Sequence, residues 1–224
     1  MDRADLHGGM SKSSAAYPTT EVRWFFTGDI PASVERWFQN LGDQNDHLES
    51  RFDRYLRLPQ EDALGIKLRE NRLEIKIRTT VYGNVTFNIG VEGCLEGWRK
   101  WSFELADGYA EATAIGDSDP SWLSIGKGRV LKRFLVDDQR RTIPVPADDT
   151  QPRTCALELT RVTALDQRWW SLALEAYGHD VKSRDGLILV ARQIFLPPCP
   201  FTLAVDNSLS FPKWLRETFS LNEA

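Results

Sequence analysis

Most of this chain alternates between apolar and polar residues with a period of two, and this pattern limits its fold more than any other feature. Side chains at alternating positions point to opposite faces of a β-strand, so such runs predict strands. From residue 51 onward the runs follow one another, with turn signals between them and no helical stretch. The predicted strands are 51–58, 64–69, 72–78, 85–91, 98–105, 122–136, 155–162, 169–177 and 187–195.

The remaining segments add a strand, two helices and a tail to this framework. Residues 21–26 are aromatic-rich and strand-like, while 31–41 shows helical spacing with Gly42 as its stop. A short helix is expected at 211–218. Residues 1–19 are polar and predict a flexible N-terminal tail, which leaves 20–224 as a single domain. The fold class is therefore mainly β (α+β), an antiparallel sandwich or barrel of eight or nine strands with a few flanking helices.

Composition excludes several classes of protein. The formal net charge of −4 speaks against general nucleic-acid binding, which usually needs a basic chain. The sequence has no apolar run of 18 residues, so no membrane span is expected. Its three cysteines are far apart and its three histidines lack metal-ligand spacing. We therefore expect a cytoplasmic, reduced protein, and its oligomeric state, a homodimer included, stays open.

Charged residues gather on one face of several predicted strands. Lys67 and Arg69 share a face, as do Lys76 and Arg78 on the next strand. A third group is Lys127, Arg129 and Arg133. Two glutamates, Glu158 and Glu175, lie within otherwise apolar strands, and Glu21 is in the first strand.

Alternation alone leaves two interpretations open. In one, each charged face is the solvated side of a half-buried sheet. In the other, the charged faces converge inside a barrel and form an anion site. The pattern cannot distinguish them, because the inner and outer faces of a strand are equivalent in a repeat of two.

The order of these motifs resembles the CYTH superfamily of triphosphate tunnel metalloenzymes. That family begins with a Glu-x-Glu-x-Lys strand, followed by a helix, a tyrosine segment, basic strands and late acidic strands. The matching segments here, over roughly residues 20–180, are Glu21-Val22-Arg23, Asp53-Arg54-Tyr55, Lys67-Leu68-Arg69, Lys76 with Arg78, Lys127-Gly128-Arg129, and Glu158 with Glu175. The resemblance implies a tunnel-like, eight-stranded antiparallel barrel lined with charge.

The resemblance also implies two sets of site residues. Phosphate-binding residues would be Lys67, Arg69, Lys76, Arg78, Lys127, Arg129 and Arg133. Glu21, Glu158 and Glu175 would bind Mg²⁺ or Mn²⁺, which prefer oxygen ligands together with substrate phosphates. Such a metal would polarise the phosphoryl group and position a water molecule.

The first strand departs from the family pattern at two positions. Arg23 stands where the family has its second metal-binding glutamate, and Phe25 replaces a lysine that donates to phosphate. We therefore expect a divergent member that binds a triphosphate or another small phosphorylated anion, such as tripolyphosphate or a nucleotide. Metal-dependent triphosphate hydrolysis is kept as a second hypothesis. A barrel that binds an apolar small molecule, lined by Leu73, Ile75 and Ile77, is the alternative from a different class.

Overall fold

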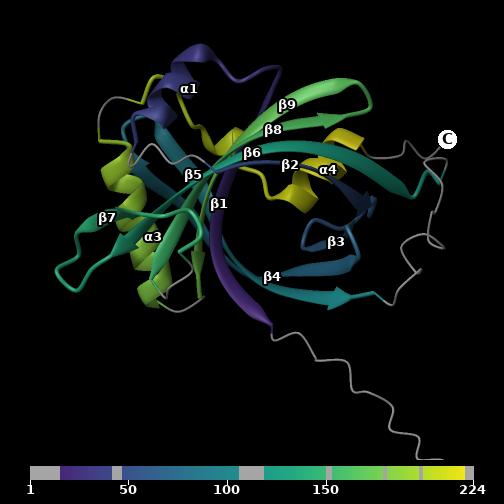
Figure 1. Ribbon diagram of the computed structural model, residues 1–224, viewed down its shortest axis with the longest axis horizontal. Helices are drawn as coiled ribbons and strands as arrows, with labels where there is room; N and C mark the ends of the chain where they lie inside the picture. Colours follow the sequence, from purple (N-terminus) through teal and green to yellow (C-terminus); the bar gives the residue numbers. More distant parts are fainter. Residues whose placement is uncertain are drawn as a thin grey trace, which may run out of the picture.

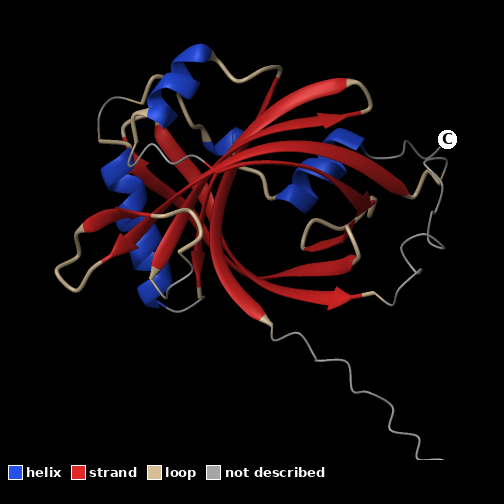
Figure 2. Ribbon diagram, in the orientation of Figure 1, coloured by secondary structure: helices blue, strands red, loops and turns tan. Residues whose placement is uncertain are grey.

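The computed structural model describes residues 16–41, 47–105, 119–149, 153–178, 181–196 and 199–219. Strands make up most of these residues (Figure 2). The elements are β1 (Tyr17–Thr27), α1 (Ala32–Gln39), β2 (His47–Leu56), β3 (Leu64–Arg69), β4 (Arg72–Asn88), β5 (Val91–Glu104), β6 (Trp122–Val136), β7 (Thr142–Val145), β8 (Thr154–Ala164), β9 (Gln167–Tyr177), α3 (Val181–Ile194), a 3₁₀ turn η1 (Val205–Asn207) and α4 (Phe211–Phe219).

The strands form one antiparallel sheet that closes into a barrel. Their order is β2-β3-β4-β5-β1-β9-β8-β6-β7, and an additional pairing of β2 with β6 joins the two sides. Ten residue pairs make that closing contact, from His47 opposite Leu131 to Leu56 opposite Trp122. β7 pairs with the end of β6 and lies outside the ring. The predicted fold class, a mainly β antiparallel barrel with eight strands and flanking helices, is confirmed among the described residues.

The larger apolar core lies outside the barrel wall, beneath α3. Leu187, Val190, Ala191 and Ile194 form one buried stripe of this helix at positions i, i+3, i+4 and i+7. They pack with outward-facing residues of β1, β8 and β9, namely Val22, Trp24, Leu157, Leu159, Leu172 and Leu174. Figure 1 shows α3 alongside the strands, well away from α4. One side of the barrel is thus covered by a helix.

The smaller core closes one end of the barrel. Helix α4 lies within the ring of strands, next to β2 and β3 (Figure 1). Its Trp214 stacks on Phe25 of β1, with ring centroids 4.6 Å apart and the ring planes 3° apart. Inward-facing residues of five strands join this aromatic cluster, which contains Phe25, Tyr55, Leu123, Ile125, Val162, Trp169, Trp214, Leu215 and Phe219. We call this cluster the plug.

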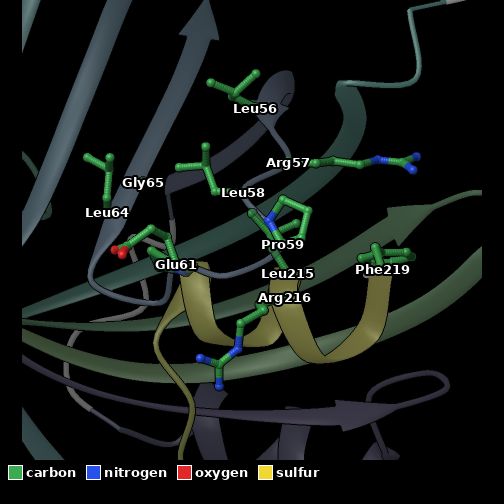
Figure 3. A pocket seen from close by; sticks show the side chains of 11 residues that line it. Leu56, Arg57, Leu58, Pro59, Glu61, Leu64, Gly65, Leu215, Arg216 and Phe219 are labelled. Atoms are coloured by element: carbon green, nitrogen blue, oxygen red, sulfur yellow. The ribbon is translucent and has the colours of Figure 1, made fainter. Parts of the chain in front are cut away.

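The seam between α4 and the barrel is nearly closed. Figure 3 shows Leu215 and Phe219 of α4 beside the 57–61 loop, with Leu58 and Pro59 facing the helix. The gap between them measures about 20 Å³, room for about one water molecule. This seam therefore offers a ligand no passage into the interior.

One predicted strand is wrong. Residues 187–194 lie in α3 and Phe195 is in the turn that follows it. The prediction failed because the run Leu187-Ile188-Leu189-Val190-Ala191 is continuously apolar and carries no clear period of its own. Short apolar runs of this kind suit a buried strand or a buried helix equally. The terminal helix is confirmed as α4, and the helix predicted at 31–41 is confirmed as α1.

Three boundaries also differ from the prediction. The turn expected between the predicted strands 72–78 and 85–91 lies inside β4, where a register shift between Val81 and Gly83 bends a single 17-residue strand. Gly93, which lies between the predicted strands 85–91 and 98–105, belongs to β5; a Cβ atom there would come within 2.6 Å of Val22. The strand β7 was not predicted, since Pro144 argues against a strand except at an edge.

The prediction that the flexible tail extends to residue 19 is wrong, because β1 begins at Tyr17. Residues 1–15, which include His7, lie outside the described residues, as does His179. Among the helices that the structure describes, none has the length and apolar character needed to cross a membrane.

Candidate functional site

The charged faces of the strands point into the barrel. A cavity of about 150 Å³, the inner cavity, lies directly above the plug, with Phe211 and Pro212 of α4 at its floor. Six strands line it with eight cationic side chains, Arg23, Arg51, Lys67, Arg69, Lys76, Lys100, Lys127 and Arg129. Four carboxylates line it too, Glu21, Glu74, Glu158 and Glu175. Cationic side chains therefore outnumber acidic ones in its wall.

A wider space of about 360 Å³, the outer cavity, continues the lumen away from the plug. The two cavities share six lining residues, Arg23, Arg69, Lys100, Arg129, Glu158 and Glu175. Tyr17 and Tyr177 stand at the far end, where both side chains are exposed. The lumen is consequently apolar at α4, charged in the middle and accessible at the tyrosines.

An arginine lies between two of the three predicted metal ligands. Arg23 donates from Nε to Glu21 (2.9 Å) and from Nη1 to Glu158 (2.8 Å). Burial would raise the pKa of Glu21, but Lys76 and Arg23 lower it to about 2. Burial would also lower the pKa of Arg23, and Glu158 and Glu21 instead raise it above its usual value. All three groups are charged at neutral pH.

A fully buried aspartate organises a second cluster. Asp53 of β2 lies within ion-pair distance of four cations, Arg51 (3.4 Å), Lys67 (3.3 Å), Arg69 (2.8 Å) and Lys127 (3.2 Å). Burial opposes its ionisation, yet Lys127, Lys67 and Arg69 hold its pKa well below the usual range. One carboxylate thus counters four cations.

A third cluster lies on β4 and its neighbours. Glu74 pairs with Lys67 (2.9 Å) and Lys100 (3.0 Å), and Arg69 lies at 3.7 Å. Burial works against ionisation of Glu74, but these cations lower its pKa to about 2. Lys76 pairs with Glu21 and lies 3.7 Å from Glu175. Every inner-cavity cation therefore has a carboxylate neighbour, and several carboxylates are shared.

Eight of the ten predicted site residues come together in the inner cavity: Glu21, Lys67, Arg69, Lys76, Lys127, Arg129, Glu158 and Glu175. Arg133 lines the outer cavity, where its guanidinium lies 5.6 Å from the ring of Tyr177. Arg78 lines neither cavity. It pairs with Asp62 (2.6 Å) and Glu96 (2.8 Å) beside Trp98.

Five further charged residues of the site were not among the predicted ones: Arg23, Arg51, Asp53, Glu74 and Lys100. For Glu74 the signal was present, since it shares a strand face with Lys76. Lys100 lies opposite Lys76 in the β4–β5 ladder. Lys100 can be assigned to the site only when the pairing register of β4 and β5 is known.

The apolar faces of the same strands point outward. Leu73, Ile75 and Ile77 alternate with the inward residues of β4, and Ile77 is 39% exposed. The lining expected for an apolar ligand is therefore on the outer surface of the barrel.

The three predicted metal ligands do not fit a divalent ion as they are arranged. A guanidinium takes the position between Glu21 and Glu158, and Lys76 lies between Glu21 and Glu175. Over the part of the chain that the structure describes, no group of three or more His, Cys, Asp or Glu side chains could hold a metal ion.

Comparisons with known proteins add little to this geometry. No protein-family model and no curated protein matches the chain. Among solved structures, a conserved hypothetical protein from Pyrococcus furiosus is 14% identical, with a TM-score of 0.43. The match covers 85% of this chain and 94% of that protein. A likeness this weak carries no inference about function.

Proposed function

We propose that this protein binds a small phosphorylated anion, such as tripolyphosphate or a nucleotide, inside the barrel without metal. The observation that carries the proposal is the convergence of eight cationic side chains on one cavity that has four carboxylates in its wall. Arginine and lysine donors at converging angles are the usual means of holding phosphate oxygens. The order of motifs that resembles the CYTH superfamily supports the same class of ligand.

The more accessible cations identify where such an anion makes its first contacts. Lys100 is 35% exposed at its side chain, Lys76 28% and Arg129 25%. All three line the inner cavity, and each already has a carboxylate partner. Anion binding therefore exchanges internal ion pairs for pairs with phosphate, so we expect affinity to fall as salt is added.

Isothermal titration calorimetry with tripolyphosphate at low ionic strength, without divalent metal, tests this proposal. We expect binding by the wild-type protein and a loss of roughly 10-fold or more in affinity for Arg69→Ala, because one charge-assisted hydrogen bond contributes about 1.5–3 kcal/mol. Arg78→Ala is the matched control, since Arg78 forms similar ion pairs outside the cavity. The absence of binding, or an equal loss in both variants, would contradict the proposal.

Two other hypotheses receive less support. Metal-dependent hydrolysis requires that Glu21 and Glu158 give up their ion pairs with Arg23 and bind a metal ion instead. Release of phosphate from tripolyphosphate in the presence of Mn²⁺ measures this hydrolysis directly. An apolar ligand has no apolar lining in the inner cavity apart from Phe211, Pro212 and the ring of Tyr55.

A further inference from the structure

Lys127 differs from the other cations of the inner cavity in its surroundings. It projects from β6 towards the plug, and only 7% of its side chain is exposed. Its Nζ atom lies 2.6 Å from the hydroxyl oxygen of Tyr55 and 3.6 Å from the centroid of the Phe211 ring. An aromatic wall thus covers one side of the amine, while the other side faces the cavity.

The ion pairs leave Lys127 without a carboxylate of its own. Asp53 is the acid within ion-pair distance of it among the described residues, and Asp53 is shared with three other cations. Each of those three has a further partner: Arg51 has Glu49, and Lys67 and Arg69 have Glu74. Lys127 is therefore the least compensated cation of the cluster.

A buried cluster with excess positive charge is relieved by losing a proton from a lysine, because arginine keeps its proton under all ordinary conditions. Burial, followed by the charge of Lys67, lowers the pKa of Lys127 well below its usual value, although Asp53 opposes the shift. The other charged groups that face it are Arg23 from β1 and Glu158 from β8. Burial and Asp53 raise the pKa of Tyr55, so its hydroxyl stays protonated. In the structure this hydroxyl accepts a hydrogen bond from Lys127 Nζ and donates one to Asp53.

We propose that Lys127 is a nucleophilic amine that forms an imine with the carbonyl group of a phosphorylated aldehyde or ketone held in the inner cavity. The phosphate part of this ligand rests on the proposed function, because the surrounding arginines and lysines hold the phosphoryl group. The carbonyl part rests on Lys127 alone. Neutral lysines in apolar or cationic pockets are the type of amine that reacts in this way.

The step is balanced without any oxidant or reductant. The lone pair of Nζ attacks the carbonyl carbon, a C–N bond forms, and the carbonyl π electrons move to oxygen. Tyr55 gives its hydroxyl proton to that oxygen and takes one from the nitrogen. The carbinolamine then breaks its C–O bond, the second nitrogen proton leaves with the hydroxide as water, and the C=N bond forms.

Borohydride trapping with glycolaldehyde phosphate tests the inference on the full chain. Wild-type protein is incubated near pH 7.5 with about one equivalent of the reagent, reduced with sodium borohydride and mapped by peptide mass spectrometry. We expect a phosphoethyl adduct on Lys127 at least 10-fold above that on the exposed Lys182 and the half-buried Lys213, which line neither cavity. The Lys182→Arg variant, whose substitution lies outside both cavities, should keep this adduct, and Lys127→Arg should lose it.

Two further arms separate this inference from the proposed function. Unphosphorylated glycolaldehyde should label Lys127 at least 10-fold less, and excess tripolyphosphate should protect it. If glycolaldehyde labels Lys127 equally well and tripolyphosphate neither binds nor protects, the amine is nucleophilic but the phosphate part is wrong. If tripolyphosphate binds while Lys127 stays unlabelled, or surface lysines take the label, the inference is refuted. Lys127→Met, whose circular dichroism spectrum should match the wild type, replaces Lys127→Arg if the latter fails to fold.

Discussion

Replacing Arg23 with glutamine tests whether this arginine holds together Glu21 and Glu158, two acids that line the inner cavity. Arg23 bridges β1 and β8 through Glu21 and Glu158, and its Nη1 also donates to Ser171 at 3.2 Å. The side chains of Arg23 and Glu21 are 9% and 6% exposed. After the substitution Glu21 keeps Lys76 and Glu158 keeps Arg129, so each loses one of two partners.

The loss of stability expected for Arg23→Gln follows from the burial of these ion pairs. Removing one partner of a buried ion pair destabilises a protein by roughly 3–5 kcal/mol. For a chain of about this length each kcal/mol lowers the melting temperature by about 2–4 °C, so Arg23→Gln should melt roughly 6–20 °C lower. Arg141→Gln is the matched control, because its ion pair with Asp137 is 67% exposed on the arginine side and should contribute at most about 1 kcal/mol.

Calorimetric melting at several pH values measures the effect. At neutral pH Glu21 and Glu158 are charged, so the difference in melting temperature between the wild type and Arg23→Gln should be largest there. Without Arg23 their pKa values rise, so the folded variant takes up protons at a higher pH than the wild type. The difference in melting temperature should therefore narrow as the pH falls from about 4.5 to 2. A loss below about 1 kcal/mol, or a difference that does not depend on pH, would refute the bridging role of Arg23.

Three further predictions concern the same lumen and its wall. Arg23→Glu places a third carboxylate between two others, so Mn²⁺ should raise the melting temperature of this variant and leave the wild type unchanged; at 100 times Kd the gain is about 2.7 kcal/mol. The pKa values of Glu21 and Glu74 are both lowered to about 2. Their contribution to the free energy of unfolding is therefore complete above pH 4.5 and is lost as the pH falls from 4.5 to 2. Urea unfolding across this range should show a fall in stability of up to roughly 3 kcal/mol per group, and Glu74→Gln should remove part of it. Gly93→Ala should destabilise the fold by roughly 1–3 kcal/mol, since its Cβ would lie 2.7 Å from the ring of Trp24, and equal melting temperatures would contradict this.

The sequence predicted which residues share a strand face, but not which face lies inside. Lys67 with Arg69 and Lys76 with Arg78 were correctly placed on common faces, because a period of two defines a face without tertiary information. Which face points inward depends on barrel closure, and the β2–β6 pairing that provides it leaves no local signal. A shared face does not by itself predict that a residue lines the cavity. Arg78 shares its face with Lys76 and yet pairs with Asp62 and Glu96 outside the cavity.

The site residues that were not predicted also depend on tertiary structure. Asp53 was recognised as part of a tyrosine segment, but its four cationic neighbours come from three strands, and only tertiary structure brings them together. The helix α3 was missed for a different reason. Its buried residues have helical spacing, but apolar residues between them obscure it.

The first strand links the two departures from the family pattern to the shape of the lumen. Glu21, Arg23 and Phe25 share one inward face, so successive residues along it change from acid to base to aromatic. Arg23 neutralises Glu21 and Glu158, and Phe25 provides the surface on which Trp214 stacks. Phe25, at the position where the CYTH pattern has a lysine, therefore gives α4 its aromatic contact at the floor of the inner cavity. Because Lys127 sits against that aromatic floor, beside Phe211, the plug also supplies the apolar surroundings that favour its neutral form.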